Sequence, residues 1–403
     1  MRRVVVTGIG VISGLGRNRE EFHAALREGR GGIGPIRNID CLDLRFRNGA
    51  EVRCFNPCDH FAPKEADMID RFAQFAVVAA REAVTQSGIE WTPHLRDTAA
   101  IVTGSCVGGQ STENEGFHDV YKLGRSRVHP MTIPKTMANA GASAISLEFG
   151  ITGPAFTIAT ACASSAHAIG QAFMMVRSGM SDVAITGGSE APFSYGILKA
   201  WEAMRVVSPI ACRPFSKDRN GMILGEGAAM LVIESRDHAL ARGAKPIAEI
   251  AGFGMSSDAH HITQPSAEGA AKALCAALRD AAIPPGRIGY INAHGTGTTV
   301  NDTTETRALH LAFGDHAQRL AISSTKAMHG HTLGAAGAIE CAAAIFAIES
   351  GVLPPTINFS EPDPECDLDY IPNCPRRAEV EYALSSSFAF GGLNAVLVLR
   401  RVE

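Results

Sequence analysis

The feature of this sequence that most constrains its fold is an internal repeat. Arg2–Ser13 resembles Lys245–Ser256, because each is a strand-like run that enters a Gly-X-Gly turn. Phe156–Gly179 resembles Leu320–Gly351, because each has a strand, a polar turn and a helix of small residues ending in Ser-Gly. Two alternating runs, "AAMLVIESRD" and "NAVLVLRRVE", close the two copies. The order predicts two similar α/β halves, residues 1–243 and 244–403.

The strand-like segments inside each copy are apolar on both faces, as in "AAIVTG", "DVAITGG" and "IGYINAHG". Such runs are typical of a sheet that helices cover on both sides. The helical segments are rich in Ala and Gly, and glycine costs a helix about 1 kcal/mol against alanine. We therefore expect close helix packing. The repeat also gives Cys162 and His331 related places, each after a turn and before a helix, so a pseudo-twofold axis could bring them together.

Charge and composition exclude several classes of protein. The 403 residues have a formal net charge of −4 and no basic block, which argues against a nucleic-acid partner. No apolar run approaches the ~20 residues of a membrane span, and no signal peptide is recognisable, so we expect a cytoplasmic protein. The spacing of Cys54, Cys58 and His60 matches no common zinc pattern, so we predict a surface loop there and no metal site.

Cys162 is the first candidate for chemistry. It lies between an apolar run and the small-residue segment "SSAHAIGQAF", which predicts a position at a helix N-terminus. There the helix dipole and free N–H groups lower the pKa of a thiol from ~8.5 and favour the nucleophilic thiolate. The alternative is a buried, inert cysteine, which is the commoner case for any single cysteine.

Two histidine segments follow in the second half. "NAHGTGTTVND" places His294 at the end of a strand, beside a glycine-rich loop whose Thr296 and Thr298 hydroxyls suit an amide-bearing ligand arm. The alternative is a turn with an incidental histidine. "STKAMHGHTLGAAGAIE" contains Lys326, His329, His331 and, on the predicted helix, Glu340. We expect His331 to be the catalytic histidine of this segment, because a helix start favours a neutral imidazole that can donate to an enolate oxygen.

The C-terminal segment "SSSFAFGGLNAV" places Phe390 before Gly391 and Gly392, where bare backbone can direct an N–H towards an oxyanion. A plain tight turn explains the same pattern. The Gly8-X-Gly10 turn resembles a dinucleotide fingerprint but lacks its third glycine and its acidic residue. Because the same turn recurs at Gly252-X-Gly254, we interpret both as fold geometry.

Four blocks, "TACASSAHAIG", "NAHGTGTTVND", "STKAMHGHTLGAAGAIE" and "SFAFGGLNA", resemble the signatures of β-ketoacyl-acyl-carrier-protein synthases of the elongating FabF/FabB type. The resemblance covers nearly the whole chain. It implies a thiolase-like five-layer α/β/α/β/α fold and decarboxylative Claisen condensation of an acyl-enzyme with malonyl-carrier protein. It also implies that the substrates are carried on phosphopantetheine, and the chemistry requires no metal or other cofactor.

The resemblance assigns roles to individual residues. Cys162 would carry the acyl group as a thioester, and His294 and His331 would stabilise the enolate. Lys326 and Glu340 would maintain the charge and hydrogen bonds of the site. The backbone N–H groups of Cys162 and Phe390 would form an oxyanion hole. The remaining implied residues are Thr296 and Thr298 at the pantetheine arm, Phe390 as gate of the acyl pocket, and Val107 in its lining.

The sequence also departs from the family at several positions. Leu393 and Ala389 stand where relatives have Thr and Gly, Cys106 where glycine is common, and His329 where a small or hydroxyl residue is common. These departures concern the shape of the acyl pocket, which Leu393 would influence. The sequence assigns no role to Cys106 or His329. The C-terminal segment is also similar to that of ketosynthases from specialised pathways, such as nodulation-factor or polyene synthesis.

An acidic carrier protein calls for basic docking residues, and Lys64, Arg205 and Arg213 are the candidates, although Asp67 stands where a base is usual. A degradative thiolase is the nearest rival reading, but the C-terminal glycine loop lacks the second cysteine that it needs. Condensing enzymes with a Cys-His-Asn set have Asn where this chain has His331. We expect a homodimer, and an active subunit paired with a non-catalytic chain-length partner is the alternative.

Overall fold

The computed structural model describes residues 2–402. The strands of the first half are β1 (Val4–Ser13), β2 (Gly34–Pro35), β3 (Asn48–Gly49), β4 (Ala100–Gly104), β5 (Ala155–Ile158), β6 (Val183–Glu190) and β7 (Gly227–Ser235). The strands of the second half are β8 (Ala248–Ser257), β9 (Ile288–Asn292), β10 (Ala321–Ser323), β11 (Val352–Leu353), β12 (Arg376–Arg377), β13 (Tyr382–Ala389) and β14 (Leu393–Arg401).

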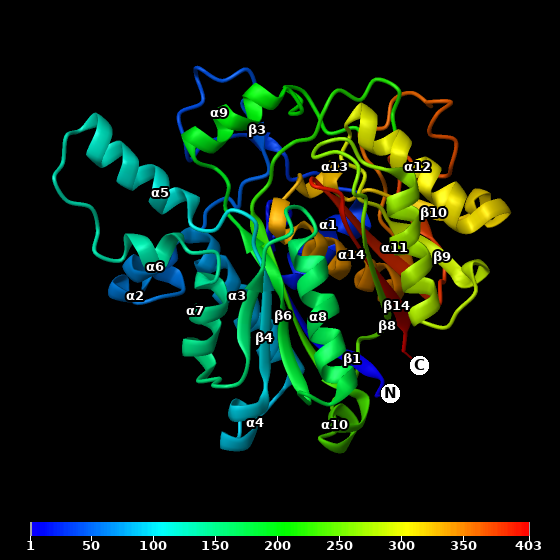
Figure 1. Cartoon of the computed structure of the whole chain (residues 1–403), viewed down its shortest axis with the longest axis horizontal. Coiled ribbons are helices and arrows are strands. Elements are labelled where there is room, and N and C mark those ends of the chain that lie inside the picture. The colour runs from blue at the N-terminus through cyan, green and yellow to red at the C-terminus, as the bar shows by residue number, and fades with distance from the viewer. Residues whose placement is uncertain (1, 403) are drawn as a thin grey trace.

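The helices of the first half are α1 (Arg19–Glu28), α2 (Pro63–Met68), α3 (Arg71–Ser87), α4 (Pro93–Thr98), α5 (Gln110–Phe117), α6 (Thr132–Thr136), α7 (Ala140–Phe149), α8 (Ser164–Ser178), α9 (Tyr195–Met204) and α10 (Arg236–Ala241). The second half has α11 (Ala267–Asp280), α12 (Thr299–Phe313), α13 (Lys326–His329) and α14 (Ala336–Ser350). Figure 1 shows their arrangement.

The predicted repeat is visible in the order of the strands. The main sheet runs β10-β9-β13-β14-β8-β1-β7-β6-β4-β5, which reads as the same five-strand unit from either end. In each unit three strands are parallel and the last two pair antiparallel. The two units join where Val4–Val6 of β1 pairs with Ala248–Ile250 of β8. The predicted five-layer fold has two sheet layers, and in this structure the two are joined edge to edge as one ten-stranded sheet.

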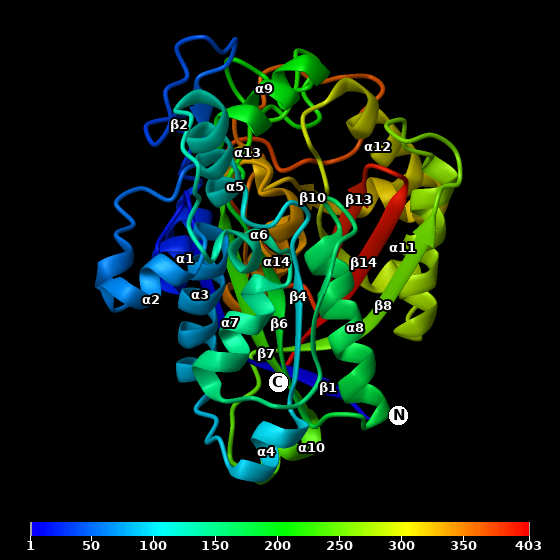
Figure 2. The same ribbon diagram turned by 60° about the vertical axis from the view of Figure 1, so that its left-hand side comes forward.

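Helices cover both faces of each unit and build five layers. Figure 2 shows α3 and α7 at the left, β6 and β4 next to them, α8 in front of β14 and β8, and α11 at the right. The helix α14 packs against α8 between the two sets of strands. Each face has its own hydrophobic core, and the largest of these cores surrounds α8 and α14. The thiolase-like five-layer α/β/α/β/α fold predicted from the sequence is therefore confirmed.

Close packing explains the glycines that seemed costly in the sequence. A Cβ on Gly337 of α14 would lie 2.8 Å from the Cβ of Ala166 on α8, so the two central helices touch through their backbones. A Cβ on Gly10 would lie 1.9 Å from the carbonyl oxygen of Ala79 in α3, and one on Gly254 would lie 2.3 Å from that of Ala273 in α11. Gly10 lies inside β1 and Gly254 inside β8, so the Gly-X-Gly turns predicted from the sequence are wrong. Both glycines are positions in a strand where a helix packs closely.

The central helix α14 has the length and composition of a membrane span over Leu333–Ser350, but 89% of that stretch is buried inside the protein. It is therefore a core helix.

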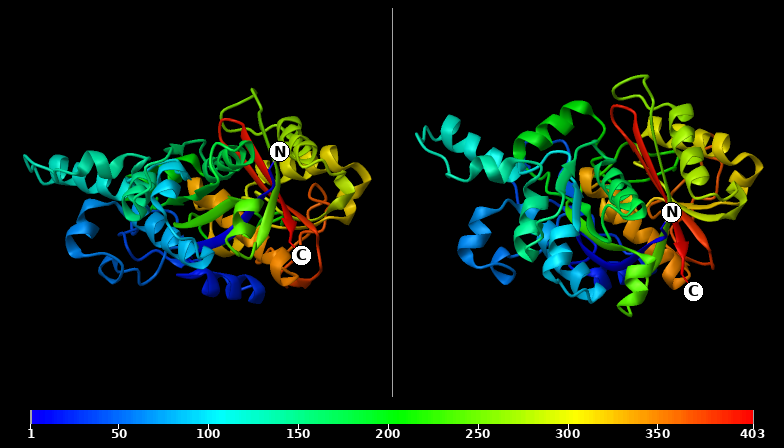
Figure 3. Two further views of the ribbon diagram at one scale, coloured as in Figure 1. Left: turned by 90° about the horizontal axis from the view of Figure 1, so that it is seen from below. Right: turned by 60° about the horizontal axis from the view of Figure 1, so that its bottom comes forward.

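Figure 3 shows that α5 and the loop after it form an arm that extends away from the body of the protein. Apolar side chains are exposed on this arm, including Phe117, Tyr121 and Leu123.

The Cys54–His60 segment is a surface loop. Cys54 and Cys58 are exposed, and His60 stacks on Phe55 with ring centroids 5.2 Å apart. Within residues 2–402 no cluster of His, Cys, Asp and Glu has the arrangement of a metal site.

Candidate active site

Cys162 lies on a tight turn between β5 and α8, two residues before the helix begins. Ala161 before it has a left-handed backbone with φ of +48°, which is strained for a residue with a side chain. The Ser164 hydroxyl holds the turn, because it accepts the Thr160 N–H at 2.9 Å and donates to the Ala161 carbonyl at 2.6 Å. This brace presents the Cys162 sulfur to a cavity, at the position predicted for a nucleophile.

The predicted effect on the thiol is wrong in direction. Burial raises the pKa of Cys162 to about 11, although the charge of Lys326 and hydrogen bonds from the N–H groups of Phe390 and Cys162 favour the thiolate and oppose this rise. The cost of burying the negative sulfur therefore outweighs the helix start. In the resting protein the thiol is protonated at neutral pH, and the same N–H groups lie ready for a negative charge that forms beside the sulfur.

His294 follows β9 and is held from two sides. The Glu305 carboxylate, on α12, accepts the N–H of His294 at 2.8 Å and that of Gly295 at 2.7 Å. The Lys326 ammonium donates to the His294 carbonyl at 2.6 Å and lies 3.2 Å from its Nδ1. Because an ammonium group can only donate, Nδ1 accepts, and the ring proton is on Nε2.

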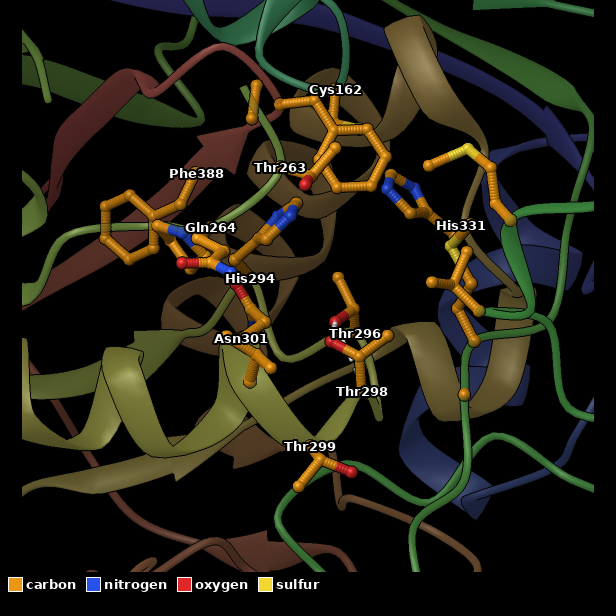
Figure 4. Close-up of a pocket in the computed structure, with 18 of the residues that line it drawn as sticks. Cys162, Thr263, Gln264, His294, Thr296, Thr298, Thr299, Asn301, His331 and Phe388 are labelled. Atoms are coloured by element: carbon orange, nitrogen blue, oxygen red, sulfur yellow. Dashed lines mark hydrogen bonds between the residues drawn. The ribbon is translucent and has the colours of Figure 1, made fainter. Parts of the chain in front are cut away.

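His331 has the same tautomer for a different reason. Its Nδ1 accepts the backbone N–H of Leu333 at 3.2 Å, which leaves the proton on Nε2. The rings of His331 and His294 lie edge to face, 5.5 Å apart. Figure 4 shows both imidazoles beside the same space as Cys162.

The position of His331 corrects one detail of the repeat. It lies five residues before α14, whereas Gly334 stands two residues before that helix, as Cys162 does before α8. Leu333 also has φ of +48°, the value at Ala161. The structural counterpart of Cys162 is therefore Gly334, and His331 lies on the segment that leads to it.

Both histidines are neutral. Burial lowers the pKa of His294 and of His331 well below 6.5, and the positive charge of Lys326 lowers each further. We predicted a neutral His331 from a helix dipole, but the structure gives burial and a neighbouring ammonium as the causes. Two neutral Nε2–H donors beside a cysteine can stabilise negative charge on a substrate oxygen.

Lys326 and Glu340 form an ion pair with no exposure of either side chain. Burial raises the pKa of Glu340, and the Lys326 charge opposes that rise. His329 also lies in this region, but its Nδ1 and Nε2 are paired with the Gly330 carbonyl at 2.8 Å and the Thr325 hydroxyl at 2.9 Å. Its ring is not part of the cavity lining.

The cavity has a volume of about 430 Å³ and contains the predicted Cys162, His294, His331 and Phe390 in its lining. Thr296 and Thr298 also line it, with their hydroxyl oxygens 2.8 Å apart. Sequence patterns did not indicate several further lining residues: Trp201, Met204, Asn220, Met222, His261, Ile262, Thr263, Gln264 and Asn301.

Two carboxylates that the sequence reasoning missed hold the site together. Glu305 positions His294, as described above. Glu190, at the end of β6, accepts the N–H groups of Cys106 at 2.7 Å and Gly334 at 3.0 Å. It therefore ties the loop after β4 to the segment before α14. Full burial of a carboxylate was the missing signal, and burial is not visible in a local motif.

Two of the three residues predicted for the acyl pocket, Val107 and Leu393, lie outside this cavity. Val107 follows β4 and donates its N–H to Glu190 at 3.3 Å. Leu393 begins β14 opposite Ala389 and packs against the central core. Neither is in the lining of the cavity, so their part in an acyl pocket stays a prediction.

The predicted docking cations are spread over the surface. Arg205 directly follows α9 and lines the cavity. Arg213 is paired with Asp218 at 2.6 Å. Lys64 is exposed on α2, which Figure 1 shows at the lower left, away from α9 at the top.

Comparison with known proteins agrees with this geometry. Residues 1–239 match the N-terminal domain of β-ketoacyl synthases, and residues 247–360 match the C-terminal domain. The chain is 47% identical to nodulation protein E of Rhizobium sp. (strain N33), over the full length of both. It is 42% identical to 3-oxoacyl-[acyl-carrier-protein] synthase 2 of Synechocystis sp., over 100% of this chain and 99% of that protein.

Solved structures give the same result. The ishigamide ketosynthase/chain length factor superposes with a TM-score of 0.95 at 38% identity, and both chains are fully covered. A β-ketoacyl synthase from Burkholderia phymatum superposes with a TM-score of 0.93 at 34% identity, again over both whole chains. The family and enzyme class predicted from the four sequence blocks are thus confirmed, and the chain belongs to the β-ketoacyl synthase family.

Proposed function

We propose that the chain elongates carrier-bound acyl chains through an acyl-enzyme on Cys162. In the first step the Cys162 sulfur attacks the carbonyl of an acyl-carrier thioester, the carrier thiol leaves with the cysteine proton, and a new thioester forms. The negative oxygen of the tetrahedral intermediate accepts hydrogen bonds from the backbone N–H groups of Cys162 and Phe390. Their hydrogen bonds to the sulfur support this role.

In the second step malonyl-carrier loses CO₂, and the electron pair of the broken C–C bond forms an enolate. The enolate oxygen accepts hydrogen bonds from the Nε2–H groups of His294 and His331. The observation that carries the proposal is this pair of neutral, tautomer-fixed imidazoles, which line one cavity with Cys162. No strong base is needed, because no C–H proton is removed.

In the third step the enolate carbon attacks the Cys162 thioester. The C–S bond breaks, the β-ketoacyl chain stays on the carrier, and the cysteine sulfur leaves as a thiolate. The charge of Lys326 stabilises that thiolate, and Glu340 keeps the lysine in place. All three steps use side-chain and backbone groups of the chain, so we propose that the reaction needs no metal and no redox cofactor.

The carrier arm enters past Thr296 and Thr298, whose hydroxyls suit the amides of phosphopantetheine. Arg205 at the cavity supports docking of an acidic carrier protein there. Arg205→Glu should raise the KM for acyl-carrier substrate and leave turnover of a small pantetheine thioester unchanged. Lys64 lies elsewhere, and Arg213 is already paired with Asp218, so we expect smaller effects from them.

We propose that the chain works as a cytoplasmic homodimer. The exposed edge strand β5 and the apolar arm around Tyr121 support a subunit interface. The alternative is an active subunit paired with a chain-length partner, as the name of the ishigamide ketosynthase/chain length factor describes for that protein. Native mass spectrometry of the isolated chain separates the two. The similarity to nodulation protein E supports a specialised pathway.

The half-reactions test the proposed roles. His294→Ala and His331→Ala should each lower CO₂ release from malonyl-carrier by ~10²–10³, because each removes one enolate donor. Acyl loading on Cys162 should change much less. Normal CO₂ release in both variants would contradict the proposal.

A further inference from the structure

A second aromatic ring lies against the proposed gate. Trp201, near the end of α9, lines the cavity together with Phe390 and Cys162. Its indole stacks on the Phe390 ring, with centroids 6.3 Å apart and planes 26° from parallel. The contact joins a helix of the first half to the glycine loop of the second half.

The glycine side of this loop is anchored. Gly391 and Gly392 have φ of +83° and +70°, a backbone region that glycine adopts without strain. The Gly391 N–H donates to the Ile262 carbonyl at 2.7 Å, and the Asp258 N–H donates to the Gly392 carbonyl at 2.9 Å. The glycines are therefore a fixed base from which the preceding residue can move.

Phe390 itself is held differently. Within residues 2–402 its backbone forms no hydrogen bond with another main-chain group. Its N–H faces the Cys162 sulfur, and its ring rests on Trp201. The position of the Phe390 N–H therefore depends on the position of the Phe390 ring. The ring, in turn, is placed against the Trp201 indole.

We infer that Trp201 is a positioning residue for acyl transfer: its indole holds Phe390 in the closed arrangement and must release the ring before a long acyl chain reaches Cys162. The inference rests on the proposed function, because it requires Cys162 to accept acyl groups. Stacked aromatic pairs contribute an interaction that corresponds to a roughly two- to tenfold shift of such an equilibrium.

The inference predicts an effect that depends on chain length. Trp201→Ala should speed the loading of long acyl chains relative to acetyl by roughly two- to tenfold, because a long chain needs the ring displaced. Trp201→Phe keeps an aromatic ring and should restore most of the wild-type ratio. Malonyl decarboxylation depends on the two histidines and should not change in either variant.

The chain has two tryptophans, which gives a direct signal. Trp91 packs on Phe149, between α3 and α4, with ring centroids 6.1 Å apart. Stopped-flow fluorescence during loading from a long-chain acyl-pantetheine should show an emission change in the wild type. The change should be absent from Trp201→Phe, which retains only Trp91. Intact-protein mass spectrometry records loading of Cys162 in parallel.

The two signals separate the possible failures. Normal mass gain with constant emission, and with equal loading ratios in Trp201→Ala and wild type, would overturn the role of Trp201 and leave the proposed function intact. A wild-type chain that gains no mass at Cys162 would overturn the proposed function and the inference with it. An emission change that keeps pace with loading, together with the altered ratio, supports the inference.

Discussion

Lys326→Met separates the structural and chemical contributions of the buried ammonium. In the native protein Lys326 neutralises Glu340 and donates towards His294. Methionine leaves the Glu340 carboxylate buried and without its partner. Breaking a buried ion pair in this way costs about 3–5 kcal/mol. We therefore expect a large loss of unfolding free energy, measured as a lower urea midpoint at mildly alkaline pH.

The double variant Lys326→Met, Glu340→Gln removes both charges and should recover most of that stability. It should not recover decarboxylation, because nothing then keeps Nδ1 of His294 as an acceptor and Nε2 as the donor. The upper limit of the rate loss is that of losing one oxyanion donor, ~10²–10³. CO₂ release from labelled malonyl-carrier measures it. A double variant with both wild-type stability and wild-type decarboxylation would refute the role of Lys326 in fixing the tautomer.

Three further predictions follow. His331→Ala should lose most decarboxylation and His329→Ala little, because only His331 lines the cavity; the reverse order in a CO₂-release assay would exchange their roles. Because the pKa of Cys162 is raised to about 11, its alkylation by iodoacetamide should still rise roughly tenfold per pH unit above pH 9, and a plateau near pH 9 would contradict the raised pKa. Leu393→Thr should alter which acyl chains load onto Cys162 and leave decarboxylation unchanged; an identical loading profile would show that Leu393 only packs.

The raised thiol pKa also has a consequence for stability. The folded protein favours the protonated thiol more strongly than the unfolded chain, whose value is near 9. The stability contributed by Cys162 is therefore complete below about pH 9 and is lost as the pH rises towards 11. Cys162→Ala should lack this loss.

The fold could be predicted because its signals are local and occur twice. The segment of β1 resembles that of β8, and the segment of β7 resembles that of β14, so the sequence indicates two copies of one strand unit. The edge-to-edge junction at Val4–Val6 could not be predicted. Neither the residues of β1 nor those of β8 indicate which strand of the other half they pair with.

The same distinction applies to the site: residues in local motifs could be predicted, and residues that only folding brings together could not. Cys162, His294 and His331 lie in short blocks whose residue types indicate their chemistry. Trp201 does not, because α9 approaches Phe390 only in the folded chain. The direction of the Cys162 pKa could not be predicted either, since helix position favours the thiolate and burial, which outweighs it, depends on every layer around the sulfur.

The central claim is that Cys162 carries the growing chain. Intact-protein mass spectrometry with peptide mapping, after exposure to a panel of acyl-carrier thioesters, tests it directly. We predict a mass increase of one acyl group on the peptide that contains Cys162, and none in Cys162→Ala. An acyl group on another residue, or undiminished loading and condensation by Cys162→Ala, would contradict the mechanism.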